Sequence, residues 1–316
     1  MALGTVPDAR IVALAGGVGG AKLAYGLARC LPPDGLTVIV NTGDDFRRYG
    51  LAISPDLDTV MYTLAELADP TQGWGLAGDT RQMVDMLRRY GDDPWFGLGD
   101  RDIATHLLRT QALSEGNSLS QVTAKLASAL GVTSHLVPMT DDCVQTMVET
   151  VEHGLLAFQE YFVRYRWQPV VTRLSYDGAA SSQPAPGVLE ALQRATAVVI
   201  CPSNPLLSVE PILQVAGIRD ALASRNAPSV AVSPIIGGQA VKGPAAKLMA
   251  ELALDASAEG VARYYGDLID GLVVDHADQE ARVPQKMMVT NSLMQTSEDR
   301  TRLAGEILGW VKSLTV

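Results

Sequence analysis

Four aspartates in one short segment are the residues of this chain best suited to chemistry. The segment NTGDDFRRYGLAISPDLDT, residues 41–59, contains Asp44, Asp45, Asp56 and Asp58. Its only cations are Arg47 and Arg48. Carboxylates this dense repel one another unless positive charge lies between them. Mg²⁺ commonly supplies that charge, because it binds hard carboxylate oxygens and bridges one or two acids to phosphate oxygens.

The four acids differ in how well local structure explains them. Asp44 suits a turn after a strand, and Asp56 suits the first turn of a helix with Ser54 as its N-cap. Asp45 and Asp58 are explained less well in this way. We therefore expect Asp45 and Asp58 to face a cleft, where they hold a metal ion or the substrate. An acid at the surface of a cleft should add little to the stability of the fold.

A glycine-rich segment precedes the acids. The sequence AGGVGGAK, residues 15–22, contains Gly16, Gly17, Gly19, Gly20 and Lys22. It lies between an apolar strand and a helix, so its N–H groups and the helix dipole could bind a phosphate. It is not a Walker A loop, because Leu23 follows the lysine. It is not a dinucleotide fingerprint either, because Lys22 replaces the last glycine and the next strand ends in Asn41 instead of an acid. A plain tight turn remains the alternative explanation.

Three further segments carry polar residues near expected strand or helix ends. They supply Ser203 and Asn204 in CPSNP, Gly237, Gly238 and Lys242 in SPIIGGQAVKGP, and Asp100 and Arg101 in GLGDRDIATH. Open α/β sheets bind ligands at the carboxyl ends of their strands. We expect these residues and Asn41 to bind a long, nucleotide-like ligand. Turn chemistry would explain each loop singly, and Asp100 also suits the N-cap of the helix that follows.

These residues can meet only if a sheet brings distant segments together. Residues 10–40 read as strand, glycine loop, helix and strand, which is how a doubly wound parallel sheet begins. Strands and helices alternate again from residue 195, and an amphipathic helix with Ser297 as its candidate cap closes the chain. We predict an α/β fold with a Rossmann-like, mostly parallel sheet and a single composite domain, residues 1–316.

The middle of the chain interrupts the α/β alternation. From residue 79 to 131 three segments with helical spacing follow one another without a strand. Residues 146–176 then alternate like antiparallel strands joined near His153 and Gly154. We predict an inserted helical and β-ribbon region at approximately 79–176.

Composition excludes several classes of function. The chain has 316 residues and a formal net charge of −10, which argues against a nucleic-acid surface. An anionic substrate would meet the same repulsion, so we expect a metal ion as intermediary. Cys30, Cys143 and Cys201 are widely separated and indicate reduced thiols, not a zinc site or a disulfide framework. No stretch reaches the roughly 18 apolar residues of a membrane span. We expect a soluble, cytoplasmic protein.

Seven segments in collinear order closely resemble the 2-phospho-L-lactate transferase family of deazaflavin coenzyme (F-420) biosynthesis. They are GGVGGAKLAYGL, VNTGDDF, ISPDLDTVMYTLA, GWGLAGDT, LGDRDIATHLLR, CPSNPLLSVEPIL and VAVSPIIGGQAVKGPAAKLM, and they span nearly the whole chain. The resemblance implies transfer of a phosphorylated three-carbon acid from a GDP-linked donor to the terminal ribityl hydroxyl of 7,8-didemethyl-8-hydroxy-5-deazariboflavin. It also implies release of GMP, a requirement for Mg²⁺ and a homodimer. Phospholactate, phosphoenolpyruvate and 3-phosphoglycerate donors stay open.

The resemblance also implies roles for residues. Asp45 and Asp58 match acids at the metal and deazaflavin site, and the glycine loop and PSNP match phosphate-binding segments. Asp58 is our preferred group for orienting or deprotonating the attacking hydroxyl. Gly97 departs from the pattern, because relatives often carry arginine or lysine near the deazaflavin at this position.

Two other classes of protein stay open. Gluconeogenesis-factor regulators resemble this fold and bind sugar nucleotides without known turnover, but they lack the combination of SPDLDT and LGDRD present here. An NAD-dependent dehydrogenase would rest only on the strand–helix–strand opening, and Lys22 and Asn41 do not fit it.

Overall fold

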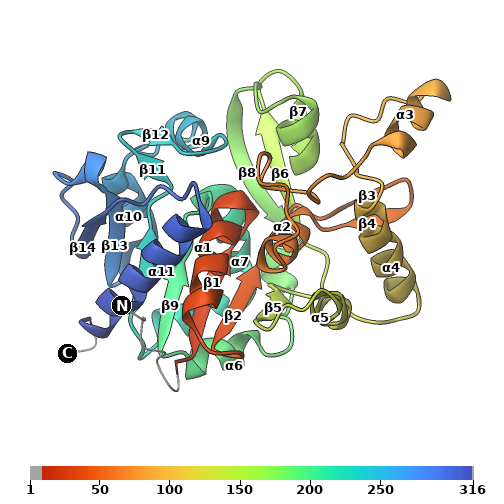
Figure 1. Ribbon diagram of the computed structural model, residues 1–316. Helices are drawn as coiled ribbons and strands as arrows, with labels where there is room; N and C mark the ends of the chain where they lie inside the picture. Colours follow the sequence, from red (N-terminus) through yellow and green to blue (C-terminus); the bar gives the residue numbers. More distant parts are fainter. Residues whose placement is uncertain (1–8, 315–316) are drawn as a thin grey trace.

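A seven-stranded parallel sheet forms the centre of the computed structural model, which describes residues 9–314 (Figure 1). Its spatial order is β14 (Lys286–Thr290), β13 (Gly271–Asp275), β10 (Ser229–Val232), β9 (Ala197–Ile200), β1 (Ile11–Ala15), β2 (Leu36–Val40) and β5 (His135–Pro138). The chain runs from β1 outward through β2 to β5, and then returns to β9 and runs outward to β14. The predicted doubly wound sheet is confirmed. Its direction of winding reverses between β1 and β9, which is where open α/β sheets bind ligands.

Helices cover both faces of the sheet because its strands are apolar on both sides. In β1, Ile11, Ala13 and Ala15 pack in one core cluster and Val12 and Leu14 in another, as the alternation of side chains in a strand requires. The first cluster also contains residues of α1 (Gly17–Cys30), α2 (Pro55–Leu64) and α11 (Ser297–Lys312). The second contains residues of α6 (Val188–Arg194), α7 (Glu210–Gln214), α8 (Ile218–Ala223), α9 (Ala245–Glu251) and α10 (Ala258–Tyr265).

The predicted helical and β-ribbon segments are confirmed as structural elements. They are α3 (Gln82–Arg89), α4 (Asp102–Ser114) and α5 (Leu119–Ala129), followed by an antiparallel sheet of β7 (Gly154–Ala157), β6 (Gln145–Thr150) and β8 (Val171–Asp177). Figure 1 shows α3 and α4 at one end of the molecule and β14 at the other. The sequence analysis missed β5, which lies between these segments in the chain and pairs with β2 in the main sheet.

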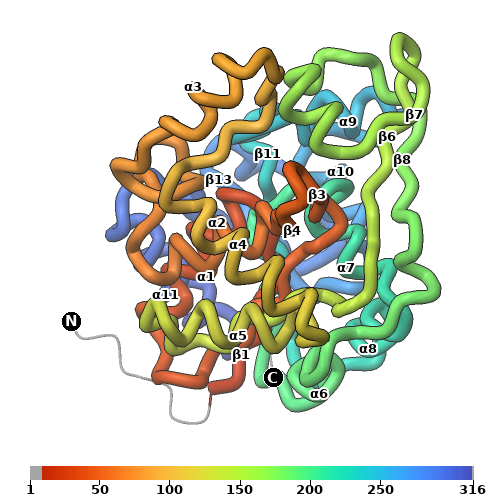
Figure 2. Tube along the Cα trace, turned by 90° about the vertical axis from the view of Figure 1, so that its right-hand side faces the viewer, coloured from red at the N-terminus to blue at the C-terminus, as the bar shows by residue number. Residues whose placement is uncertain are grey.

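A short hairpin carries the acidic segment between the main sheet and the inserted helices. It consists of β3 (Phe46–Arg48) and β4 (Leu51–Ile53), which pair in an antiparallel manner. In Figure 2 the hairpin lies between α4 and the strands β6 and β8. Ala52 N donates to Thr110 Oγ1 of α4 at 2.8 Å, and Thr146 N of β6 donates to Gly43 O at 2.6 Å. The acidic segment is therefore held from both sides by the inserted region.

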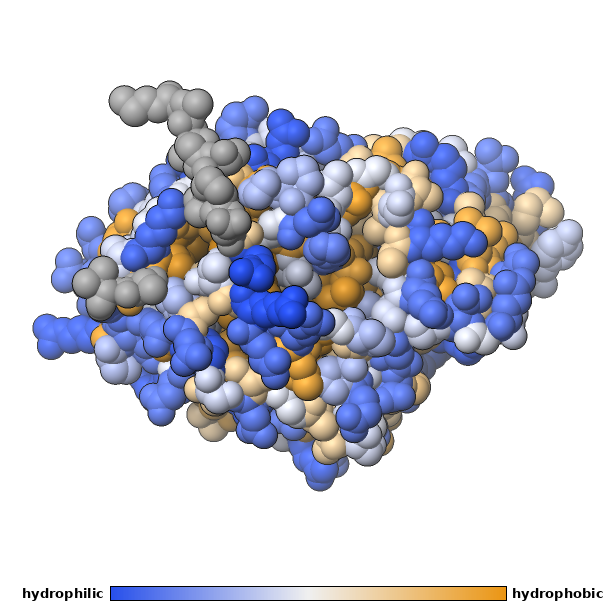
Figure 3. Space-filling model, turned by 90° about the horizontal axis from the view of Figure 1, so that it is seen from below, coloured by the Kyte–Doolittle hydropathy of each residue, from blue (hydrophilic) through white to orange (hydrophobic). Residues whose placement is uncertain are grey.

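Two details of the outer structure complete the fold. The C-terminal helix is capped by Thr296 and Asp299, which form a reciprocal capping box, so the predicted cap Ser297 is instead the first helical residue. The underside of the view in Figure 1 is mostly hydrophilic, with apolar residues in small separate patches (Figure 3). Between residues 9 and 314, no helix is long and apolar enough to cross a bilayer.

Candidate active site

A cavity of about 350 Å³ opens at the carboxyl ends of β1 and β9. Eight of the residues predicted for the site line it: Gly16, Gly17, Gly19, Lys22, Asp58, Ser203, Asn204 and Lys242. Seven others do not line it: Gly20, Asn41, Asp45, Asp100, Arg101, Gly237 and Gly238. The main sheet and the inserted region both contribute to the walls, since Phe96, Phe158 and Phe162 line the same cavity.

The glycine loop packs directly against the loop that follows β9. Ser203 Oγ accepts a hydrogen bond from Gly16 N at 3.1 Å and donates one to Gly16 O at 2.9 Å. A Cβ atom on Gly19 would lie 2.2 Å from the carbonyl oxygen of Pro202, and one on Gly20 would lie 2.6 Å from Ser203 Oγ. These glycines are therefore required for the close approach of two loops at the switch point, whether or not they also bind a phosphate.

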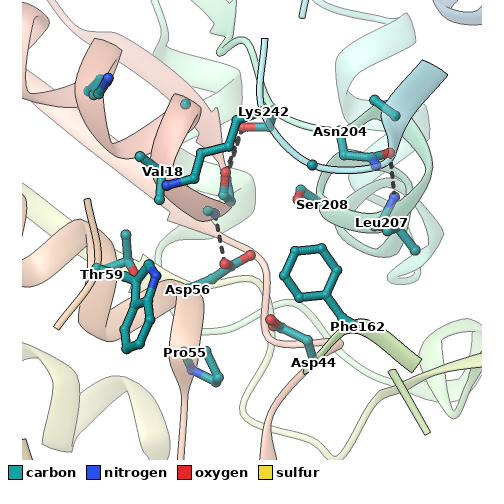
Figure 4. Close-up of a pocket in the computed structure, with 18 of the residues that line it drawn as sticks. Val18, Asp44, Pro55, Asp56, Thr59, Phe162, Asn204, Leu207, Ser208 and Lys242 are labelled. Carbon is teal, nitrogen blue, oxygen red and sulfur yellow. Dashed lines mark hydrogen bonds between the residues drawn. The ribbon is translucent and has the colours of Figure 1, made fainter. Parts of the chain in front are cut away.

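The N-terminus of α1 faces the carboxylate of Asp56. Asp56 Oδ1 accepts from Gly17 N at 2.7 Å, and Asp56 Oδ2 accepts from Asn41 Nδ2 at 3.0 Å. Asn41 Nδ2 also donates to Asp44 Oδ1 at 3.2 Å, so its amide lies between the two acids. Asn41 therefore does not line the cavity, but it holds two of the carboxylates that do. Figure 4 shows Asp56 and Asp44 on one side of the pocket and Lys242 on the other.

Burial gives these acids unusual protonation behaviour. Burial raises the pKa of Asp56 to about 6, against the opposing effect of the hydrogen bonds from Asn41 and Gly17. Burial and the neighbouring carboxylates of Asp56 and Asp45 raise the pKa of Asp44 well above its usual range. Gln159 Nε2 donates to Asp44 Oδ2 at 3.2 Å and partly offsets this. Asp44 and Asp56 therefore line the pocket as buried acids, and the turn and helix-start explanations for them were incomplete.

Asp45 lies behind this pair. Ser54 Oγ donates to Asp45 Oδ2 at 2.6 Å, while Asp45 Oδ1 is buried and has no hydrogen-bond partner among residues 9–314. Ser54 is the N-cap residue of α2 but makes no side-chain capping bond, because its hydroxyl donates to Asp45 instead. Burial raises the pKa of Asp45 well above its usual range, although Ser54 lowers it.

Asp58 belongs to a second, deeply buried group. Arg109 of α4 binds it with both terminal nitrogens, and the Nη1 to Oδ2 distance is 3.0 Å. Asp58 is 5% exposed and Arg109 is 2% exposed. The expectation that Asp58 adds little to stability was therefore wrong, because its removal would leave a guanidinium buried without its counter-charge.

His106 and Asp102 complete the second group. His106 Nδ1 lies 3.3 Å from Arg109 Nη1, and His106 Nε2 lies 3.3 Å from Asp102 Oδ2. Tyr62 of α2 donates to Asp102 Oδ1 at 2.6 Å. Burial acts to raise the pKa of Asp102, but His106 and Tyr62 outweigh it and lower the pKa. The sequence signal for this group was the spacing of Asp102, His106 and Arg109 along one helix face, and none of the three was predicted to belong to the site.

Asp100 and Arg101 lie away from the cavity. Asp100 accepts from the backbone of Gln82 and Met83, each at 2.9 Å, and so caps α3 instead of the helix that follows it. Asp79 accepts from Arg101 N at 2.9 Å and takes the place that we predicted for Asp100 at the start of α4. The two aspartates thus tie the starts of α3 and α4 together.

Two lysines bring positive charge to the pocket. Lys22 Nζ donates to Met294 O at 2.8 Å, and burial with the charges of Arg300 and Lys242 lowers the pKa of Lys22. Lys242 Nζ donates to Gln72 O at 2.5 Å, and burial lowers its pKa as well. Both lysines make these hydrogen bonds to backbone carbonyls and keep charge available for an anion. Gly237 N binds Asp278 instead, at 3.0 Å from Oδ2.

The acidic residues fit a divalent metal ion. The aspartates of residues 44–58 offer hard oxygen atoms, and the buried Oδ1 of Asp45, which has no hydrogen-bond partner among residues 9–314, leaves room for a positive partner. Asp58, Asp102 and His106 form a second set of ligand atoms, all within 4.8 Å of one another. Mg²⁺ prefers carboxylate oxygens to an imidazole nitrogen, so the aspartates suit it better than His106 does.

A parallel sheet with an acidic, glycine-lined pocket at its switch point is typical of α/β proteins that bind phosphorylated ligands. Sequence comparison identifies the particular group. The chain belongs to the family described as 2-phospho-L-lactate transferase CofD, whose sequence model matches residues 11–309. The predicted resemblance is confirmed, and the protein is a CofD-type transferase.

Named relatives fall into two groups. A phosphoenolpyruvate transferase of Kitasatospora aureofaciens is 51% identical over 86% of this chain and 87% of its own. Another, from Streptomyces coelicolor, is 42% identical over 94% of this chain and 99% of its own. A 2-phospho-L-lactate transferase of Methanocaldococcus jannaschii is 38% identical over 96% of this chain and 99% of its own.

A solved structure supports the fold. A UPF0052-family protein from Bacillus halodurans aligns with a TM-score of 0.63 over 96% of this chain and 99% of its own. At 14% sequence identity, the similarity concerns the fold alone.

Proposed function

We propose that the protein transfers a phosphorylated three-carbon acid from a GDP-linked donor to the terminal ribityl hydroxyl of 7,8-didemethyl-8-hydroxy-5-deazariboflavin, with release of GMP. One observation carries the proposal: the family match extends over residues 11–309, and all seven segments that carry the resemblance supply walls of a single cavity. The more similar relatives named above are phosphoenolpyruvate transferases, so phosphoenolpyruvate is our first choice for the transferred group.

The donor fits the side of the cavity formed by the main sheet. The loops at Gly16–Gly19 and Pro202–Asn204 present backbone groups there, and Lys22 and Lys242 present positive charge. A diphosphate carries the opposite charge and needs such partners, because the chain as a whole is strongly acidic. These residues would bind the diphosphate and fix its orientation.

The acidic residues fit the reacting centre. Asp44, Asp45, Asp56 and Asp58 would hold Mg²⁺, with Asn41 and Gln159 keeping the carboxylates of Asp44 and Asp56 in place. When bound, Mg²⁺ would neutralise charge that develops on the diphosphate and the departing GMP. Asp58 is fixed by Arg109 and would orient the attacking hydroxyl.

The acceptor fits the side formed by the inserted region. Phe96, Phe158 and Phe162 of this region line the cavity together with Trp74, which precedes it in the chain, and they offer flat apolar surface for a fused ring. Gly97 leaves room beside them, and the guanidinium of Arg81 lies 3.4 Å from where its Cβ would be. Arg81 would thus place a cation near the acceptor at the position where relatives often carry one.

The direct test supplies the purified protein with Mg²⁺, the deazaflavin and each GDP-linked acid in turn. Mass spectrometry should detect a deazaflavin product that has gained the phosphorylated acid, together with an equal amount of GMP. Absence of product with all three donors would refute the transferase proposal. Tight binding of a sugar nucleotide without turnover would favour the regulator, and tight binding of NADH without deazaflavin binding would favour the dehydrogenase.

The proposal further includes a homodimer acting in the cytoplasm, which rests on the resemblance alone. Sedimentation of the purified protein should give a mass near twice the 33.6 kDa of one chain. A monomer at micromolar concentration would contradict this part.

A further inference from the structure

The hydrogen bonds of Arg109 determine which nitrogen of His106 carries the proton. Arg109 Nη1 lies 3.3 Å from His106 Nδ1 and 3.0 Å from Asp58 Oδ2. An arginine side chain can only donate hydrogen bonds, so His106 Nδ1 must accept. The ring proton of His106 is then on Nε2, which is the atom on the other side of the ring.

That Nε2–H group is buried, and its residue lines the cavity. His106 is 1% exposed, and Nε2 has no hydrogen-bond partner in the described part of the chain. Asp102 Oδ2 lies 3.3 Å away without the alignment of a hydrogen bond. A buried donor without a partner is costly, and at the wall of a cavity it indicates a missing ligand atom.

The cavity therefore presents a donor and an acceptor next to each other. Asp102 Oδ1 accepts from the hydroxyl of Tyr62, whereas Oδ2 on the same carboxylate faces His106 at 3.3 Å and accepts no aligned hydrogen bond within residues 9–314. A hydroxyl group both donates and accepts, so it can satisfy His106 Nε2–H and Asp102 Oδ2 together. A phosphate oxygen only accepts and would bring negative charge towards Asp102 and Asp58.

The same geometry argues against His106 as a metal ligand. Coordination through Nε2 would move the ring proton to Nδ1, where it would face the N–H of Arg109. Coordination through Nδ1 would displace that N–H altogether. His106 is thereby separated from the carboxylates that fit Mg²⁺.

We propose that His106 Nε2 and Asp102 Oδ2 bind a hydroxyl of the acceptor's ribityl chain, and that Arg109 is the positioning residue that fixes the tautomer of His106. Asp102 also borders a small hollow with Trp74 and Gly97, next to the surface suited to the ring, so a polyol chain attached to that ring would reach it. This inference rests on the proposed function, because it takes a deazaflavin polyol as the acceptor.

Kinetics of three variants test the hydroxyl site. In His106→Gln the side-chain amide replaces Nε2–H, and the KM for the deazaflavin should stay within about threefold of wild type. In His106→Phe the donor is lost, and that KM should rise about tenfold while the KM for the GDP-linked donor is unchanged. His135→Gln is the matched control, since His135 is exposed, forms an ion pair with Asp34 and does not line the cavity, and it should behave as wild type.

Three outcomes would overturn the inference and leave the proposed function intact. The first two concern an active His106→Phe variant: an unchanged KM for the deazaflavin, or an equal rise in the KM for the GDP-linked donor. The third is a higher Mg²⁺ requirement in His106→Gln. The proposed function itself fails only if wild type forms no product. NMR of ¹⁵N-histidine-labelled wild type adds a test that needs no variant. It should show that Nε2 of His106 is protonated and that Nδ1 is unprotonated. A proton on Nδ1 would overturn the assigned tautomer.

Discussion

Asp56 should make the metal-free protein more stable in mild acid. Asp56 is 7% exposed, its carboxylate accepts from Gly17 N and Asn41 Nδ2, and burial raises its pKa from 3.8 to about 6. Because the pKa is higher in the native state, the native state holds the proton more tightly than the unfolded state does. The resulting stability is fully present below pH 3.8 and is lost as the pH rises through about 6.

The size of this effect follows from the two pKa values. At pH 5.0 a native group with a pKa of about 6 is protonated roughly ten times as often as it is ionised, whereas the unfolded group is mostly ionised. A tenfold ratio corresponds to about 1.4 kcal/mol. At pH 7.5 the contribution is close to zero. The pKa values of Asp44 and Asp45 are raised in the same direction, so wild type should gain more than Asp56 alone provides.

Urea unfolding in EDTA at pH 7.5 and pH 5.0 measures the effect. The free energy of unfolding of wild type should rise between the two pH values, and in Asp56→Asn the rise should be smaller by about 1.4 kcal/mol. Asp93→Asn is the control, because Asp93 lies exposed on the segment between α3 and α4 and its substitution should leave the rise unchanged. A wild type that loses stability at pH 5.0, or an Asp56→Asn variant with an unreduced rise, would refute the reasoning.

Three further predictions follow from contacts at the site. Asp58→Asn should abolish transfer and destabilise the fold by about 3–5 kcal/mol, because Arg109 is left buried without its partner. In thermal melts the double variant Asp58→Asn/Arg109→Met should recover part of that stability. An undiminished melting temperature of the single variant would contradict this prediction. Gly19→Ala should destabilise the fold by about 1–3 kcal/mol, because its Cβ would lie 2.2 Å from Pro202 O. Gly309→Ala in α11 is the control, because its Cβ would meet nothing within 4 Å and the substitution should be neutral or stabilising. Equal melting temperatures of the two variants would contradict the close approach of the loops. Excess EDTA should stop GMP release and added Mg²⁺ should restore it, and release that continues in EDTA would exclude a metal role.

The sheet was predictable because its strands carry their own signal. Short apolar and β-branched runs such as IVALA and LTVIV predict strands buried on both faces, and the glycines and polar residues after them mark the carboxyl edge. The strand β5 was missed because HLVP has only four residues and contains a proline, which is tolerated there since the strand forms the edge of the sheet.

The site was predictable in its location and less so in its detail. Sequence placed the acids and the glycine loop at the same edge, but it could not show that Asn41 would hold Asp44 and Asp56 together. It also could not show that Arg109, 51 positions away, would neutralise Asp58. Caps were misassigned for the same reason: Asp79 precedes α3 but caps α4, and Asp100 precedes α4 but caps α3, through contacts 17 to 23 positions apart in the chain. Local patterns identify the residue types, whereas the partners come from tertiary structure.

A crystal grown with Mn²⁺, GDP and the deazaflavin would test the central assignment most directly. We expect an anomalous peak within coordination distance of at least two of the carboxylates of Asp44, Asp45, Asp56 and Asp58. A fully occupied ternary complex with no peak at these oxygens would contradict it.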